Sequence, residues 1–242
     1  MDRDHSARLF HFEHRVLLAD TDPSGRMRLD AISRVLQDAA TLDVESTNLA
    51  KKGPWVIRWM DFAAHGLPSY LEQLDVTTYC SGIGRAWAER STIIKSESSS
   101  ITAVANWVLL DDLGRSPIRL SKEFISVYGE SANGKTSSPR LHLSQRLSSF
   151  ELTERILVPL RYADLDIMGH MNNAIHLALV EEALFQFGIK LLDDFKYRIE
   201  FHSEIEPKAP VSVGVRKSQG TTMLALLQNE NIKSIIELAK VI

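Results

Sequence analysis

Cysteine is almost absent from this chain of 242 residues, in which Cys80 is the only one. A single cysteine cannot form an intrachain disulfide, and a chain without a disulfide framework is typical of a reducing compartment. Cys80 lies in an alternating, strand-like run with no Cys/His signature around it. We therefore interpret it as the thiol of a half-buried strand and not as a nucleophile.

Long hydrophobic runs and an excess of basic charge are missing as well. No segment approaches the ~18 consecutive apolar residues that a membrane span requires, and the first residues lack the layout of a secretion signal. Up to residue 130 the chain has 15 basic and 18 acidic residues, and the remainder has 13 of each. We therefore expect no nucleic-acid partner, no membrane span and a cytoplasmic location.

What the chain does contain is a short motif that occurs twice. Residues 19–27 read Ala-Asp-Thr-Asp-Pro-Ser-Gly-Arg-Met, and residues 163–171 read Ala-Asp-Leu-Asp-Ile-Met-Gly-His-Met. The identical residues are all related by one offset of 144 positions, as from 22 to 166. This indicates a duplicated unit of about 120 residues. The copies differ where chemistry is expected, because Arg26 occupies the position of His170.

A helical pattern follows each motif. Apolar spacings of three and four predict an amphipathic helix over residues 29–40, with Gln37 on its polar side. The second helix, over residues 174–187, is apolar almost all round and should be enclosed. Alternating and β-branched segments joined by short turns then predict antiparallel strands. These strands are expected at residues 75–81, 85–94 and 101–110, and again at 197–202, 211–217, 221–228 and 232–241.

This order of elements predicts an α+β fold of two tandem hotdog domains, each a long central helix wrapped by an antiparallel sheet. The N-terminal repeat is expected over residues 1–130, and the C-terminal repeat over residues 151–242. Residues 131–150 form the linker and lead-in, since linker composition begins just before them. Pairing the two repeats covers the sheet edge and apolar flank that a single unit would expose.

The Asp-x-Asp-x-x-Gly motif also has interpretations without catalysis. A strand-to-helix turn uses Asp to accept backbone hydrogen bonds and Gly to adopt a positive φ, and this suffices for the first copy. A calcium loop is excluded because its twelfth position is Ala31 or Ile175 instead of glutamate. A helical zinc pair needs a spacing of four, whereas His170 and His176 are six apart. No metal is expected.

The second copy gathers polar residues where its helix starts. A carboxylate and an imidazole can orient and deprotonate water, while N–H groups at a helix N-terminus stabilise a developing negative charge. Such residues are suited to transferring an acyl group to water, although a histidine beside a helix start is also a common structural donor. The residues concerned are Asp166, Gly169, His170, Asn172 and Asn173.

Residues 161–173 resemble the Asp-x-x-Gly-His-Val-Asn-Asn signature of hotdog thioesterases. Further segments of the first half, at residues 36–40, 55–58, 107–111 and 115–117, are similar to the acyl-acyl carrier protein thioesterase family. The resemblance spans roughly residues 15–242. It implies an enzyme that releases free fatty acid from acyl-acyl carrier protein, with water as nucleophile and no metal or organic cofactor.

The resemblance also implies roles for particular residues. Matched by position, Asp166, His170 and Glu200 are expected to be catalytic. The N–H groups near Asn172 and Asn173 are expected to hold the oxyanion.

The first repeat is expected to shape the acyl tunnel. Met168 and Gly169 of the motif are candidates to contact substrate. Met27 and Trp55 are candidate tunnel walls beside Val35 and Ala39, with core packing as the alternative for all of these wall residues.

Two positions depart from the family pattern. Met168 stands where the family has Asn, and Phe201 stands where many plant members have Cys, so no thiol can attack there. Met-Gly-His is common in single-hotdog acyl-CoA thioesterases, which leaves the carrier open between acyl carrier protein and CoA. A non-catalytic acyl-binding protein, a dehydratase acting on β-hydroxyacyl thioesters and a homodimer stay open too.

Overall fold

The computed structural model describes residues 7–47, 49, 53–147, 152, 154–207, 209–218 and 220–240. The N-terminal repeat begins with a lead strand and a 3-10 turn, continues into a long helix, and ends in four strands. These elements are β1 (Phe10–Arg15), η1 (Leu18–Asp20), α1 (Leu29–Glu45), β2 (Trp55–His65), β3 (Gln73–Ile83), β4 (Trp87–Lys95) and β5 (Ser100–Leu109).

The C-terminal repeat has the same order of elements, and a connecting segment with one α-helix precedes it. The connection contains α2 (Lys122–Ala132) and η2 (Leu143–Gln145). The repeat then consists of β6 (Glu154–Val158), η4 (Tyr162–Asp164), α3 (Asn173–Gln186), β7 (Asp194–Phe201), β8 (Val211–Ser218), β9 (Thr221–Gln228) and β10 (Asn231–Lys240).

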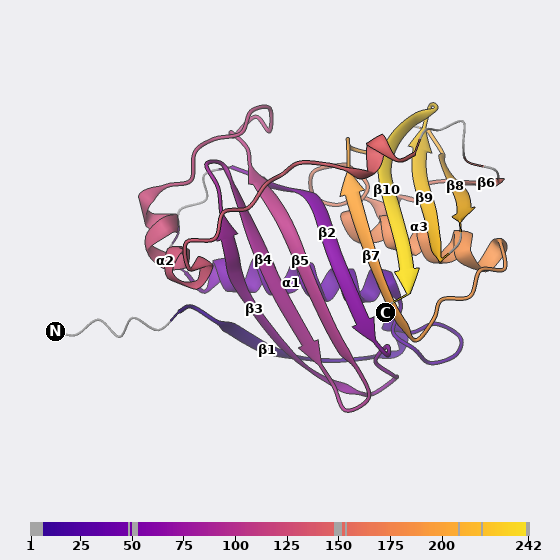
Figure 1. Cartoon of the computed structure of the whole chain (residues 1–242), viewed down its shortest axis with the longest axis horizontal. Coiled ribbons are helices and arrows are strands. Elements are labelled where there is room, and N and C mark those ends of the chain that lie inside the picture. The colour runs from indigo at the N-terminus through magenta and orange to yellow at the C-terminus, as the bar shows by residue number, and fades with distance from the viewer. Residues whose placement is uncertain are drawn as a thin grey trace.

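All ten strands belong to one antiparallel sheet in the order β1-β3-β4-β5-β2-β7-β10-β9-β8-β6 (Figure 1). Counted inward from the two edges of the sheet, the strands β1, β3, β4, β5 and β2 of the first repeat correspond in order to β6, β8, β9, β10 and β7 of the second. The two repeats are therefore related by an approximate two-fold axis. They join where β2 pairs with β7, with Met60 opposite Ile199. Each repeat thus covers an edge that the other would expose. The predicted α+β tandem hotdog fold is confirmed.

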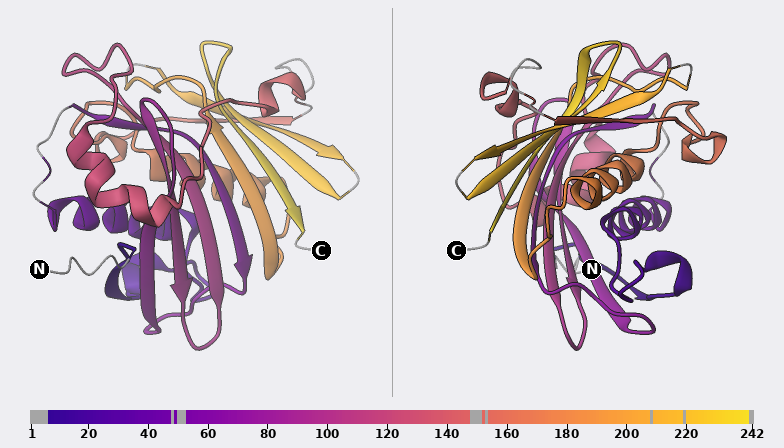
Figure 2. Two further views of the ribbon diagram at one scale, coloured as in Figure 1. Left: turned by 60° about the vertical axis from the view of Figure 1, so that its left-hand side comes forward. Right: turned by 90° about the vertical axis from the view of Figure 1, so that its right-hand side faces the viewer.

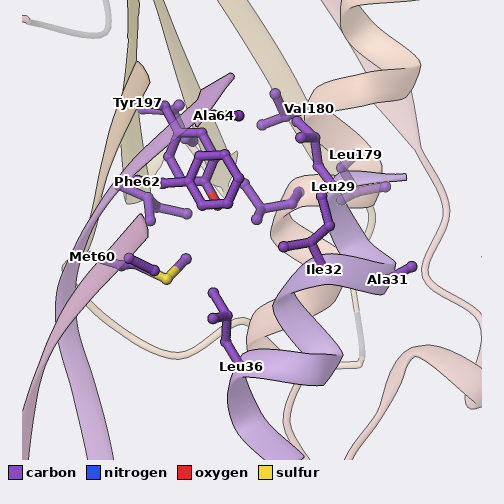
Figure 3. Packing of buried hydrophobic residues seen from close by; sticks show 14 of the residues in the cluster. Leu29, Ala31, Ile32, Leu36, Met60, Phe62, Ala64, Leu179, Val180 and Tyr197 are labelled. Carbon is purple, nitrogen blue, oxygen red and sulfur yellow. The ribbon is translucent and has the colours of Figure 1, made fainter. Parts of the chain in front are cut away.

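Helices α1 and α3 lie side by side on the concave face of this sheet (Figure 2). The core lies between the helices and the strands at the junction, where Phe62 of β2 stacks on Tyr197 of β7 with ring centroids 4.6 Å apart (Figure 3). Helix α3 is buried along most of its length, as its apolar sequence predicts, but its C-terminal part exposes Glu182, Phe185 and Gln186. Its buried residues are Ala174, His176, Leu177, Leu179, Val180, Ala183 and Leu184.

Strand β2 was not among the predicted strands, although it joins the two repeats. A β-bulge shifts its register between Ile57 and Trp59, so that Trp59 and Met60 are both buried. The bulge therefore breaks the alternation on which strand prediction depends.

Helix α2 was missed too, and the boundary expected after residue 130 falls within its last turn. The helix ends at Ala132, and the capping residue Asn133 takes the left-handed conformation with φ of 45°. Among the described residues, no helix combines the length and apolar character needed to cross a membrane.

Candidate active site

The duplicated motif forms the same turn in both repeats, here called turn 1 (residues 20–29) and turn 2 (residues 164–173). In turn 2 the Asp166 N–H donates to the His170 carbonyl at 2.9 Å and the Gly169 N–H donates to the Asp166 carbonyl at 3.0 Å. Turn 1 repeats both bonds through Asp22 and Gly25. Both glycines have positive φ, 78° and 83°, which explains why the motif ends in Gly.

Turn 2 leads directly into α3, and Asp164 holds it in place. Burial opposes ionisation of this carboxyl, but hydrogen bonds from the Arg161 backbone and guanidinium outweigh it and lower the pKa of Asp164. The Asp164 carbonyl accepts the Asn172 N–H at 2.9 Å. The Asn172 Oδ1 in turn caps α3 by accepting the Ala174 N–H at 2.8 Å. Asp164 and Asn172 therefore fix the N-terminus of α3.

A cavity of about 490 Å³ lies between α1, the concave face of the first-repeat strands and turn 2. This volume is within the range of small-molecule sites. Asp166, Asn172 and Asn173 contribute the lining from turn 2. Most of the remaining wall is apolar, and its members include Ala40, Val44, Leu49, Trp55, Ala88, Trp107, Leu109 and Phe124.

The structure therefore brings together Asp166, Asn172, Asn173 and Trp55 of the residues singled out in the sequence. Met168 is half-exposed, and its backbone N–H donates to Asp166 Oδ1 at 2.9 Å. Its neighbour Ile167 lies at the mouth of the cavity and is fully exposed. Gly169 contributes the bend of the turn described above.

Met27, Val35 and Ala39 are buried in the hydrophobic core and do not line this cavity, which corrects their assignment as tunnel walls. The first-repeat helix presents a neighbouring face to the cavity. That face consists of Gln37, Ala40, Thr41, Val44 and Glu45.

The His170 side chain is directed elsewhere. Its Nε2 lies 3.2 Å from Glu204 Oε2, and the residue is not part of the cavity lining. Its backbone carbonyl, which accepts the Asp166 N–H, is its contribution to the turn. The structure thus links His170 to Asp166 through the backbone, whereas the sequence suggested a shared site of side chains.

Glu200 is separated from Asp166 by the sheet itself. The neighbouring Ile199 and Phe201 belong to the core on the helix side, so Glu200 points to the opposite face because side chains alternate along a strand. Its fully buried carboxylate accepts the N–H groups of His142 at 2.8 Å and Leu143 at 2.9 Å. Arg198 Nε donates to it at 3.0 Å. Glu200 therefore anchors the connection between the repeats, and the expectation that it polarises water is not supported by this geometry.

Two contacts between the paired helices, one beside the cavity and one away from it, were not predicted from the sequence. Gln37, placed on the polar side of its helix, reaches from α1 to α3 and donates from Nε2 to Asn172 Oδ1 at 3.2 Å. Glu181 reaches from α3 to α1, where its Oε2 accepts the Leu29 N–H at 3.0 Å. The offset of 144 relates residue 37 to residue 181, so the duplication in the sequence pairs these two positions. Burial raises the pKa of Glu181 to about 7.

Two other buried titratable groups, Cys80 and His176, have surroundings that indicate structural roles. Burial raises the pKa of Cys80 to about 11, which agrees with a strand thiol that does not act as a nucleophile. Burial lowers the pKa of His176 to about 3, and this residue bonds Ser234 Oγ at 2.9 Å. Among the described residues no three His, Cys, Asp or Glu side chains gather as metal ligands.

A tandem hotdog fold with a carboxylate and a helix N-terminus facing a largely apolar cavity fits the class of thioester hydrolases. Comparison with known families makes this specific, because the acyl-ACP thioesterase N-terminal domain matches residues 7–128 and the C-terminal domain of the same family matches residues 148–237. The chain belongs to the acyl-ACP thioesterase family.

Individual relatives are distant in sequence but similar over their full length. An uncharacterized protein of Mycobacterium tuberculosis is 21% identical over 97% of this chain and 93% of its own. The structure of an acyl-ACP thioesterase from Bacteroides thetaiotaomicron is 14% identical with a TM-score of 0.77, covering 96% of this chain and 97% of its own. That of the 12:0-ACP thioesterase from Umbellularia californica is 14% identical with a TM-score of 0.76, covering 96% of both chains. At these identities the two structures show the shared fold.

Proposed function

We propose that this thioester hydrolase cleaves acyl-acyl carrier protein and releases a free fatty acid. The observation that carries the proposal is a cavity with a mostly apolar wall, into which turn 2 brings Asp166 and the start of α3. Its other polar lining residues are Gln37, Thr41, Glu45, Glu89, Arg90 and Ser121. Both domains of the acyl-ACP thioesterase family match the chain, and two structures of the same fold are named as thioesterases of acyl-ACP substrates. These names support the carrier.

Asp166 is proposed as the general base. Met168 N–H holds its Oδ1, whereas among the described residues none donates a hydrogen bond to Oδ2. A water between Oδ2 and the thioester carbonyl can pass a proton to the carboxylate as its oxygen attacks the carbonyl carbon. The products of this step are a protonated Asp166 and a tetrahedral oxyanion.

The N-terminus of α3 is proposed to stabilise that oxyanion. Asn173 is the first residue of α3, so its N–H has no acceptor within the helix, and the helix dipole favours negative charge at this end. Collapse of the intermediate breaks the C–S bond. The departing thiolate takes the proton from Asp166, which restores the carboxylate and completes the balance.

The acyl chain is proposed to lie along α1. Ala40 and Val44 form one side of the cavity, and Trp55, Leu109 and Phe124 contribute the wall beyond them. These surfaces offer apolar contact worth about 0.8 kcal/mol for each methylene that leaves water. The first repeat thus supplies the binding surface for a reaction that occurs at the second.

The carrier is tested by hydrolysis of matched substrates. The same acyl chains, from eight to eighteen carbons, are offered on acyl carrier protein and on CoA, and release of free fatty acid is followed by mass spectrometry. We expect kcat/KM to be at least about tenfold higher on acyl carrier protein, equivalent to about 1.4 kcal/mol of added transition-state binding.

The alternatives give different results in the same assay. Equal or faster hydrolysis of acyl-CoA would overturn the carrier and keep the reaction. Thioester binding without hydrolysis would identify an acyl-binding protein, and formation of an enoyl product from a β-hydroxyacyl thioester would identify a dehydratase.

A further inference from the structure

The two central helices exchange one side chain each across the approximate two-fold axis. Glu181 of α3 places a carboxylate oxygen 3.0 Å from the Leu29 N–H, the first N–H of α1. The corresponding residue of α1 is Gln37, and it meets the start of α3. The two residues are at equivalent positions, but Glu181 is an acid that accepts a backbone N–H, whereas Gln37 is an amide that donates to a side-chain oxygen.

The Glu181 carboxyl group occupies the N-terminus of α1. A carboxylate is an acceptor without donors, and the positive end of a helix attracts it. With Glu181 bound, the Leu29 N–H is no longer available to any other acceptor. The start of α1 is therefore already occupied by the protein's own carboxyl group.

The amide leaves the other terminus available. Gln37 directs Nε2 to Asn172 Oδ1 at 3.2 Å, and the same oxygen caps the Ala174 N–H at 2.8 Å. Among the residues that the structure describes, no group accepts the Asn173 N–H. Gln37 also lines the cavity together with Asn172 and Asn173, so the uncapped N–H lies beside it.

We propose that Gln37 is a positioning residue of the active centre. Its amide orients the Asn172 cap, and its lack of charge keeps the start of α3 free for the oxyanion. The inference rests on the proposed function, because it assigns that oxyanion to thioester hydrolysis. It makes the active centre a composite of both repeats, and it makes the choice between amide and acid at this one position a condition for activity.

The test replaces the Gln37 amide with the carboxylic acid that its counterpart Glu181 carries. In Q37E the ionised carboxylate can accept the Asn173 N–H as Glu181 accepts that of Leu29, and kcat/KM should fall by about 10² to 10³, as when an oxyanion donor is lost. Protonation returns a neutral side chain of similar shape. The ratio of kcat/KM for Q37E to that of wild type should therefore rise as the pH falls from 8 to 5.

Two further variants separate charge from packing. Q37M removes the hydrogen bond without adding charge, and we expect a smaller loss in kcat, independent of pH, with KM unchanged. E181Q is the matched control at the other terminus, and its kcat/KM should stay within about twofold of wild type, as is usual away from a functional site. Thermal unfolding of each variant confirms that the comparison is between folded proteins.

The possible results distinguish this inference from the proposed function. A wild type that hydrolyses thioesters, with a Q37E ratio that is constant from pH 5 to 8, overturns the role of Gln37 alone. If Q37E does not fold, a wild-type kcat for Q37M overturns it instead. A wild type that hydrolyses no thioester overturns the proposed function, and the inference with it.

Discussion

Turn 1 and turn 2 share a backbone and differ in chemistry. Both close with the same two hydrogen bonds and both lead into a central helix. In turn 1 the residue before the helix is Arg28, whose guanidinium donates to the carbonyls of Thr21 and Ala19. In turn 2 that residue is Asn172, whose short side chain caps the helix and lines the cavity. Duplication has thus kept the scaffold and changed the side chains that surround it.

The wall of the cavity shows the same asymmetry. Ala40 lines the cavity from α1, and the offset of 144 relates it to Leu184 of α3, which is buried in the core. A small residue leaves space where a large one fills it. Differences at three positions, Arg28 against Asn172, Glu181 against Gln37 and Leu184 against Ala40, distinguish the two ends of the helix pair.

The largest effect is expected from removing the proposed base. Asp166→Asn removes the carboxylate with little change in volume, and kcat should fall by about 10² to 10⁴. The matched control is Asp22→Asn in turn 1, where kcat should change by no more than about twofold. Steady-state hydrolysis by both purified variants checks the pair, and a similar loss in both would remove the distinction between the turns.

Glu200→Ala contrasts a buried structural carboxylate with the proposed catalytic one. It removes the acceptor of the His142 and Leu143 N–H groups and a partner of Arg198, so the free energy of unfolding should fall by about 3 to 5 kcal/mol. Turnover per folded molecule should change far less than in Asp166→Asn. Denaturant unfolding and active-fraction kinetics measure the two quantities. Normal stability with lost turnover would return Glu200 to the catalytic set.

Glu181→Gln tests the role of Glu181 at the N-terminus of α1 through the pH dependence of stability. The pKa of Glu181 is raised to about 7 in the folded protein, above its usual value, so its contribution to stability is full below about pH 4.5 and is lost as the pH rises towards 7. The wild type should lose up to about 1.4 kcal/mol per pH unit relative to the variant over this window. Urea unfolding at intervals from pH 4.5 to 8 measures the difference, and a constant difference would contradict the assignment.

Ala40→Leu places in the cavity wall the leucine that α3 has at the corresponding position, Leu184. The larger side chain should shorten the preferred acyl chain, at about 0.8 kcal/mol, or roughly fourfold in kcat/KM, for each methylene that it displaces. Short chains should be hydrolysed as before. A chain-length panel checks this, and an unchanged preference would mean that the acyl chain lies elsewhere.

The sequence predicted the fold because the duplication and the hydrophobic periodicity can be read directly from it. The largely buried helix α3 and most strands followed from their patterns, and the family followed from segments of the first repeat together with the residues around Asp166. Strand β2 was missed because its bulge at Ile57 and Trp59 interrupts the alternation. Glu200 was predicted to be catalytic from a positional match, which says nothing about which face of a strand a side chain takes, and in β7 that face is turned from the cavity.

Gln37 could not be assigned to the site from one helix alone. Its polar character suggests a solvated face, and only the packing of α1 beside α3 brings it to Asn172. Lining the two helices up by the offset of 144 would have paired it with Glu181, but the sequence does not show that the two helices exchange these side chains. Contacts between repeats depend on how the repeats are docked.

The central claim is that the chain has one reactive centre, at turn 2, and an occupied counterpart at turn 1. Calorimetric titration with an acyl-pantetheine analogue in which a ketone methylene replaces the thioester sulfur counts such sites directly. We predict one analogue bound per chain, with binding retained in Asp22→Asn and weakened in Q37E at pH 8. Two analogues per chain, or binding that depends on Asp22 and is unaffected by Q37E, would contradict the account.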